Sequence, residues 1–145
     1  MATTDLALSD ALDAVKQLFD AESGKTAGPQ VINARTIPGP AVDGSYSVHL
    51  ASSTNTNRYR DNERLRLQHK LVVGFMVRMK MFNQYDSVLD GLDEEQRFIE
   101  AAGLEVDYVP VRLEYVSTTR EATQTNEYLL TQITFAFEHD LGRMT

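Results

Sequence analysis

Cysteine is absent from this 145-residue chain, and its absence excludes three kinds of chemistry. The chain has no disulfide framework, no zinc site built on thiolates and no cysteine nucleophile. Long apolar runs are also missing, since no stretch approaches the roughly 20 apolar residues that a membrane-spanning helix needs. The N-terminal residues lack a basic region followed by an apolar run, so we predict no signal peptide. We expect one domain over residues 1–145, made in a cytoplasm and used there or in a particle assembled there.

Basic residues are scarcer than acidic ones, 14 against 21, and the two signs are segregated along the chain. Residues 1–24 contain one lysine and five acids, and residues 86–107 contain one arginine and eight acids. Between them, residues 58–80 contain seven basic residues and two acids. Such segregation is typical of plain solvated surface, and it also suits head-to-tail association, which closes into a ring when the rotation allows it.

No enzyme signature emerges from the remaining motifs. Ser23-Gly24-Lys25-Thr26 ends like a phosphate-binding loop, but Phe19 stands where that motif needs a glycine, and a predicted helix precedes it. No serine–histidine–acid spacing occurs, and the acids at 93–95 suit the first turn of a helix, where they stabilise its dipole. We therefore predict no catalysis, no cofactor and no bound metal.

The three histidines match no ligand spacing. His69 and His139 would approach each other if their two strands pair, and such sets do bind metals. A hydrogen-bonded histidine at the end of a core face is the more common arrangement. We predict this second role for His69.

The segment from Arg64 to Lys80 carries the strongest structural signal. From Leu67 to Met79 every odd position except His69 is a large apolar residue, which is the period of a half-buried strand. A strand of 14 residues is roughly 46 Å long at about 3.3 Å per residue. A compact domain of this size has a diameter near ~38 Å. The strand must therefore bend strongly or project beyond its own domain.

The other predicted elements follow from periodicity and turn residues. Thr4 or Asp5 is expected to cap the first helix, Gly91 to break the second, and Asp93 to cap its restart. Pro110 should place its strand at a sheet edge. The predictions are a helix over 4–21 with an apolar face of Leu8, Leu12, Val15 and Phe19, a short strand over 31–37, a strand over 46–50, a polar loop over 51–63, a helix over 87–102 with a face marked by Val88, Leu92, Ile99 and Ala102, a strand over 109–115, a loop over 117–126 and a final strand over 129–137.

The order of these elements is α-β-β-α-β-β, with a possible extra short strand after the first helix. Two hairpins around a helix favour an α+β fold of mostly antiparallel sheet with flanking helices.

An arginine-rich segment precedes and opens the long strand, and it consists of Arg58, Tyr59, Arg60, Arg64 and Arg66. Arginines around an aromatic residue can contact phosphate and stack on a base. The overall acidic charge and the interleaved acids Asp61 and Glu63 oppose that reading. A protein–protein contact is the preferred interpretation, with phosphate contact and plain solvated loop as alternatives.

Three segments together resemble the tail terminator and head–tail joining (neck) proteins of long-tailed bacteriophages. They are Arg64-Leu65-Arg66-Leu67-Gln68-His69-Lys70-Leu71-Val72-Val73, the acidic Leu92-Asp93-Glu94-Glu95, and the C-terminal Leu129-Leu130-Thr131-Gln132-Ile133-Thr134-Phe135-Ala136-Phe137-Glu138-His139-Asp140-Leu141. The resemblance covers roughly residues 46–141, and the predicted element order agrees with the α+β fold of that family.

The resemblance implies a structural virion protein of the tail or neck, assembled in the bacterial host cytoplasm. In that family, subunits form a homo-oligomeric, hexameric ring that caps the tail tube and presents the surface to which the head attaches. The implied partners are other copies of the chain, the tail tube protein, a head completion or connector protein, and DNA that passes through the lumen without specific binding. No membrane is implied.

The family supplies no site residues, so candidate contacts between subunits come from charge alone. The basic candidates are Arg58 and Arg60 in the loop, with the aromatic Tyr59 between them, and Arg64, Arg66, Lys70 and Arg78 of the strand; the acidic candidates are Glu94, Glu95 and Glu100. The alternatives are another connector component, such as a head completion or tail tube protein, a small metal-dependent enzyme built on the histidines, and a ligand-binding module.

Overall fold

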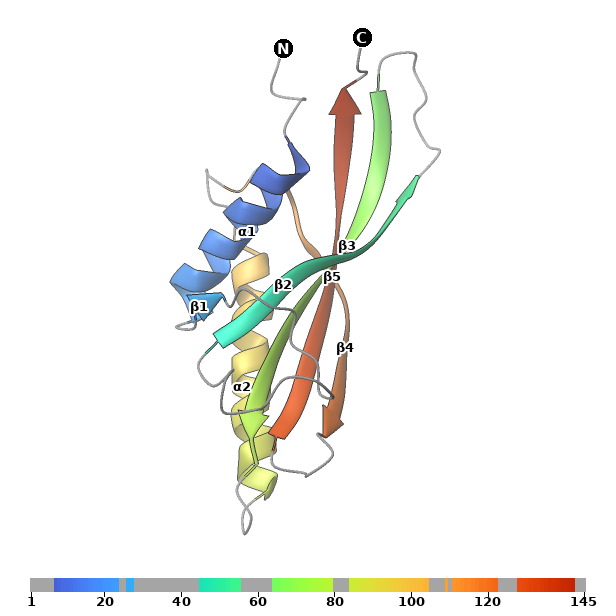
Figure 1. The fold of residues 1–145 in the computed structure, drawn as a ribbon. Helices are drawn as coiled ribbons and strands as arrows, with labels where there is room; N and C mark the ends of the chain where they lie inside the picture. Colours follow the sequence, from blue (N-terminus) through green and yellow to red (C-terminus); the bar gives the residue numbers. More distant parts are fainter. Residues whose placement is uncertain are drawn as a thin grey trace.

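The computed structural model describes residues 7–23, 26–27, 45–55, 64–79, 84–104, 109, 111–122 and 128–142. Its elements are α1 (Leu8–Ser23), β1 (Thr26–Ala27), β2 (Ser45–Asn55), β3 (Arg64–Arg78), α2 (Gln84–Ala102), β4 (Glu114–Ala122) and β5 (Tyr128–Gly142). The strands form one sheet in the order β1-β2-β3-β5-β4 (Figure 1). Only the two-residue β1 is parallel to its neighbour. The predicted α+β fold of mostly antiparallel sheet is therefore confirmed.

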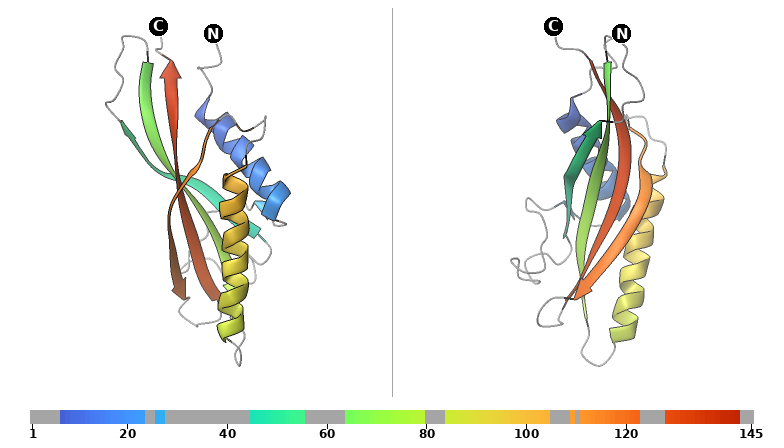
Figure 2. Two further views of the ribbon diagram at one scale, coloured as in Figure 1. Left: turned by 180° about the vertical axis from the view of Figure 1, so that it is seen from behind. Right: turned by 90° about the vertical axis from the view of Figure 1, so that its right-hand side faces the viewer.

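The centre of the sheet is the pairing of β3 with β5, which runs without interruption from Arg64↔Gly142 to Arg78↔Tyr128. At about 3.3 Å per residue these 15-residue strands are roughly 50 Å long. The sheet twists along this length, and the Arg64 end of the pair extends past the first turn of α1 (Figures 1 and 2). The predicted long strand is confirmed, and it does project beyond the helices.

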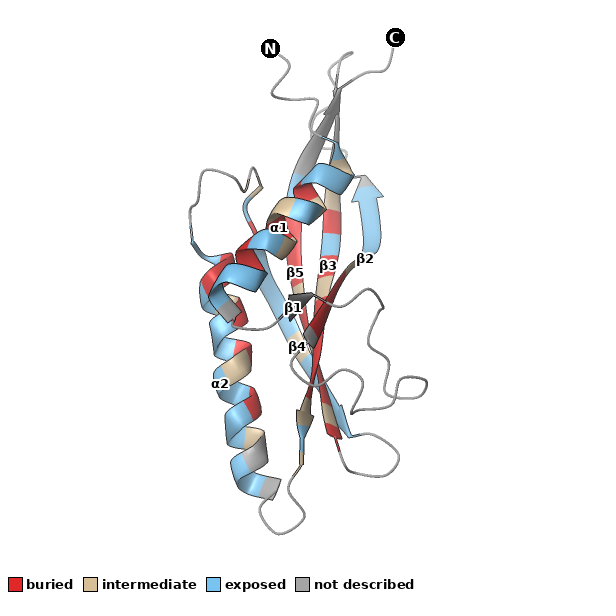
Figure 3. Cartoon of the chain, turned by 60° about the vertical axis from the view of Figure 1, so that its left-hand side comes forward, coloured by how far each residue is buried: buried red, intermediate tan, exposed pale blue. Residues whose placement is uncertain are grey.

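Both helices pack on one face of the sheet (Figures 2 and 3). The odd-numbered residues of β3 and β5 face them, and Leu71, Val73 and Phe75 are fully buried there, as the alternation predicted. Aromatic rings fill the centre of this layer. Phe98 of α2 lies 5.2–5.4 Å, centroid to centroid, from three rings, those of Phe19, Tyr46 and Phe75.

A hydroxyl group joins β2 to α1. The Tyr46 hydroxyl lies 2.6 Å from Oδ1 of Asp20 and 2.9 Å from the carbonyl oxygen of Lys16, and it donates its proton toward these acceptors. Burial and the neighbouring Asp20 carboxylate raise the pKa of Tyr46 well above its ordinary value, so the phenol stays protonated. This contact holds α1 over the β2 side of the sheet.

The first helix is confirmed, but its predicted start is wrong. The amide of Ala11 donates to the carbonyl of Ala7 at 3.1 Å, which makes Ala7 the residue before the helix and Leu8 its first. Thr4 and Asp5, the predicted caps, lie outside the described residues. The predicted apolar face is correct at its centre, since Val15 and Phe19 are fully buried.

The second helix is continuous, and the predicted break at Gly91 with a restart at Asp93 is wrong. A β-carbon built at Gly91 would lie 3.1 Å from Cγ2 of Val77, so the glycine lets α2 approach β3 closely. The predicted face is correct for Ala102, which is buried, and wrong for Leu92, which is 40% exposed; Gly91 and Phe98, which were not predicted on this face, are buried.

Two strands were misplaced by the sequence. β2 continues through Asn55, so the loop predicted over 51–63 is wrong for its first five residues. After a register shift near Ala51, Ser52 to Asn55 pair with β3.

β4 begins at Glu114, beyond Pro110, and extends to Ala122 over residues that were predicted as loop from 117 on. It is an edge strand as predicted, but the proline is not the cause. The predicted strand over 31–37 lies outside the described residues, and the short β1 follows α1.

Candidate assembly surface

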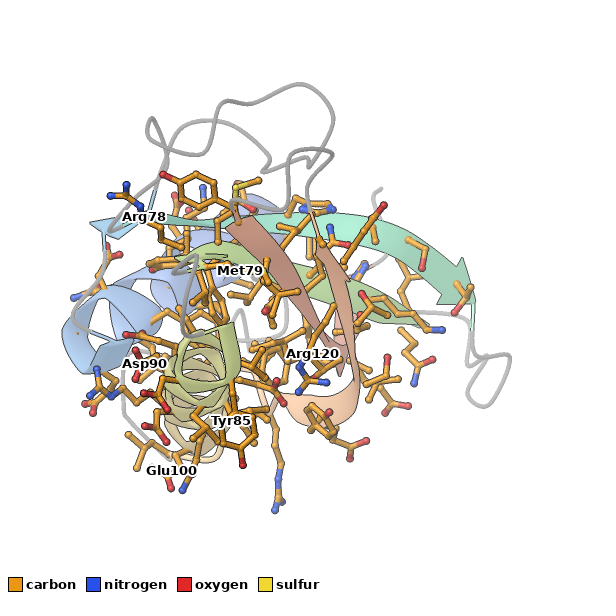
Figure 4. All side chains as sticks on the ribbon, turned by 90° about the horizontal axis from the view of Figure 1, so that it is seen from below. Arg78, Met79, Tyr85, Asp90, Glu100 and Arg120 are labelled. Atoms are coloured by element: carbon orange, nitrogen blue, oxygen red, sulfur yellow. The ribbon has the colours of Figure 1, made fainter. Side chains whose placement is uncertain are left out.

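The basic candidates lie on β3 or outside the described residues. Arg58, Tyr59 and Arg60 belong to the part that the structure leaves undescribed. Arg64 and Arg66 open β3, in register with Gly142 and Asp140. Lys70 and Arg78 are exposed. Both are even-numbered residues of β3, so they lie on the sheet face opposite the helices (Figure 4, where Arg78 is labelled). That face is not purely basic, because β5 places Glu138 opposite Gln68.

The acidic candidates all lie on α2, and they differ in what they contact. Glu95 is buried, and its carboxylate accepts hydrogen bonds from Arg120 and from Thr118, the latter at 3.2 Å. The Glu94 carboxylate lies 3.7 Å from Arg97, and that of Glu100 accepts a 2.8 Å hydrogen bond from Gln96. Glu95 therefore fastens α2 to β4 within its own chain, whereas Glu100 is exposed and Glu94 is half-buried.

The acidic helices and the described basic side chains of β3, those of Lys70 and Arg78, lie on opposite sides of one sheet. α2 contains six acidic residues and one arginine, a net charge of −5, and α1 contains four acidic residues and one lysine, a net charge of −3. β3 contains four basic residues and no acid. Because the sheet separates them, the acidic helices of one copy can meet the basic strand only in another copy.

A set of exposed apolar residues was missed by the sequence reasoning. Tyr85, Leu89 and Leu92 follow one another along α2, with exposed fractions between 40% and 73%. Tyr115 and Val116, at the start of β4, are nearly half exposed. The spacing i, i+4, i+7 on α2 is visible in the sequence, and it is the signal that indicates a second apolar stripe.

His69 is the core histidine that the sequence predicted. It is fully buried; its Nδ1 lies 2.6 Å from the Ser53 hydroxyl and its ring is 5.1 Å from that of Phe137. The strand pairing places His139 opposite Leu67, two residues along β3. Among the described residues, no group of three or more histidine or acidic side chains is arranged to hold a metal ion.

His49 of β2 makes the stability sensitive to acid. Burial lowers the pKa of its imidazole below the ordinary 6.5, since the charged form is poorly solvated there. The unfolded chain therefore binds a proton at higher pH than the folded chain. We expect the free energy of unfolding to be fully retained above pH 6.5 and to decrease as the pH falls toward the folded-state pKa.

Urea unfolding of the wild type and of His49→Gln at pH 7 and pH 5 measures this effect. The variant should lose less stability between the two pH values, because all other titrating groups are shared. Equal losses in both proteins would show that His49 does not contribute.

Comparisons with protein-family models and with curated proteins found no match for this chain. Neither helix in the described part of the chain is both long enough and apolar enough to cross a membrane.

Proposed function

We propose that this chain is a structural virion protein of a tailed phage or a phage-derived particle, a subunit of a homo-oligomeric, hexameric ring. The ring caps the tail tube and presents the surface for head attachment, without catalysis. Its partners are further copies of the chain, the tail tube protein, a head completion or connector protein, and DNA that passes without specific binding. This assignment rests on the sequence resemblance. The distribution of charge on the surface of the structure supports it.

One observation carries the proposal, which is the separation of charge by the sheet. The two helices have a net charge of −8, ten acids against two basic residues, whereas the opposite face of the sheet presents Lys70 and Arg78 of β3 together with Glu138 of β5 and is therefore far less acidic. A molecule with two unlike surfaces associates head to tail, and such contacts give rings when they close. The acidic helices also suit passage of DNA, because lasting phosphate contacts depend on lysine and arginine.

The histidine-based enzyme gains no support from the geometry. His69 has no exposed surface, and its Nδ1 is engaged by Ser53. Another connector component remains the alternative within the structural class, and it differs in which partner the ring binds.

Light scattering of the purified protein over a range of concentrations tests the ring. A hexamer has about six times the 16.3 kDa mass of the chain. We expect this mass, or a monomer that converts to it when tail tubes are added. A chain that stays monomeric in both conditions would contradict the proposal.

A further inference from the structure

The sheet has two open edges on opposite sides. Within the described residues β4 pairs only with β5, so its other edge is unpaired. In the same described part of the chain, β1 pairs only with Ser45 and Tyr46 of β2, so nine of the eleven residues of β2 have no described strand partner on that side. β4 is also nine residues long. The two edges therefore match in length.

The β4 edge is only partly protected against pairing with another strand. Natural edge strands are commonly guarded by charged side chains, above all lysine, and by proline, short length or bulges. The segment from Glu114 to Ala122 contains neither lysine nor proline, and of its three charged residues Glu114 precedes the bulge and Arg120 is bound to Glu95, which leaves Glu121. Its one bulge, near Val116, lies close to its start, and the six residues from Ser117 to Ala122 continue in regular register with β5. That stretch is free to accept a strand.

The exposed apolar residues lie beside this edge. The contact of Glu95 with Arg120 and Thr118 holds α2 against β4, so Tyr85, Leu89, Leu92, Tyr115 and Val116 belong to one side of the molecule. Figure 4, viewed from below, shows Tyr85 on the side of α2 toward Arg120 and Asp90 on the opposite flank. Exposed apolar patches next to polar surface mark interaction sites.

We infer that β4 of one copy pairs with the open edge of β2 in a second copy, so that the sheet continues from subunit to subunit. α1 lies over β2 through Tyr46, so the neighbour's α1 comes to lie beside α2 and covers its apolar stripe. β2 contains no charged residue, so Arg120 and Glu121 meet no like charge on it. Pairing of β4 with β4 would stop at a dimer, whereas β4 with β2 repeats and closes.

This inference rests on the proposed ring and changes which contact closes it. Adjacent acidic helices repel each other across the new contact, with net charges of −3 and −5. Salt screens that repulsion, since the Debye length falls from about 10 Å at 0.1 M to about 3 Å at 1 M. Assembly through the strand edges is therefore promoted by added salt. Assembly through contacts between acidic and basic faces would be weakened by added salt.

Two edge variants test the contact. Thr119→Lys alters β4 and Thr54→Lys alters the open edge of β2, where Thr54 is opposite the uncharged Gln68, and both residues are exposed in the monomer. Each alone should raise the concentration for half assembly by roughly tenfold or more, because a lysine guards an edge. Asp90→Asn makes the same change of charge on the opposite flank of α2 and should assemble as the wild type does. Unchanged thermal unfolding of the monomers verifies that all three variants fold.

Mixing the two edge variants gives the sharpest readout by native mass spectrometry. The mixture retains one intact contact, between β4 of Thr54→Lys and β2 of Thr119→Lys, so it should form dimers that contain one copy of each and grow no further. Rings from either variant at wild-type concentration would overturn the inference and leave the proposed ring intact. A wild type that never assembles would overturn both.

Discussion

Phe98→Ala should lower the free energy of unfolding by about 3–5 kcal/mol, as expected for an aromatic residue removed from a packed core. Phe98 is fully buried, and its ring contacts those of Phe19, Tyr46 and Phe75. These residues come from α1, β2 and β3, so one side chain joins both helices to the sheet. The cavity left by the substitution would be surrounded by rigid rings that cannot easily collapse into it.

Urea unfolding, followed by circular dichroism at low protein concentration, measures this loss. Tyr85→Ala is the matched control, because it also removes an aromatic ring from α2 but at a position that is 73% exposed. It should change the stability by less than about 0.5 kcal/mol. Similar losses in the two variants would mean that the aromatic cluster is not the centre of the fold.

Arg120→Ala should have the second largest effect, a loss of about 2 kcal/mol, because it leaves a largely buried carboxylate without its charged partner. The Glu95 side chain is only 11% exposed, and Thr118 alone would remain to donate to it. The Arg120 side chain is 37% exposed, so solvent screening keeps the loss below that of a fully buried pair.

The chain offers a matched pair on the same helix. The Arg97 side chain lies 3.7 Å from Glu94, and it is 58% exposed while Glu94 is half-buried at 27%. Arg97→Ala should therefore lower the free energy of unfolding by less than about 0.5 kcal/mol.

The double variant Glu95→Ala/Arg120→Ala should be more stable than Arg120→Ala, since it also removes the buried carboxylate that the single variant leaves without a charged partner. A double variant that is less stable would contradict this explanation.

The sequence predicted the elements whose pattern is produced by burial on one face. In β3 and β5 the alternation is clear because the helices cover only the odd-numbered residues, such as Leu71 and Phe135. The same holds for α1, where Val15 and Phe19 mark the buried side. Local periodicity was sufficient in these cases.

The errors fall where distant contacts decide the structure. β4 is polar and exposed on nearly every residue, so it has no alternation, and its hydrogen bonds to β5 make it a strand. The last residues of β2 are strand for the same reason, through β3. In the sequence alone Gly91 resembles a helix breaker. Its close approach to Val77 of β3, a contact between residues on different elements, explains the glycine instead.

The candidate surface was predicted only in part. Charge segregation along the chain was visible in the sequence, and the sheet turns it into two opposite sides. Glu95 could not be distinguished from Glu94 and Glu100, because its partner Arg120 lies 25 residues away on another element. The sequence alone could not show which apolar stripe of α2 faces the core. Leu92, the larger side chain, is exposed, whereas its neighbour Gly91 is buried.

Electron microscopy of growing tail tubes tests the proposed capping role. The proposal expects head and tail genes beside the gene for this chain, and the tube protein encoded there supplies the tubes to which the purified protein is added. We expect a ring at one end of each tube and no further elongation. Tubes that continue to grow, with the protein left unbound in solution, would contradict that role.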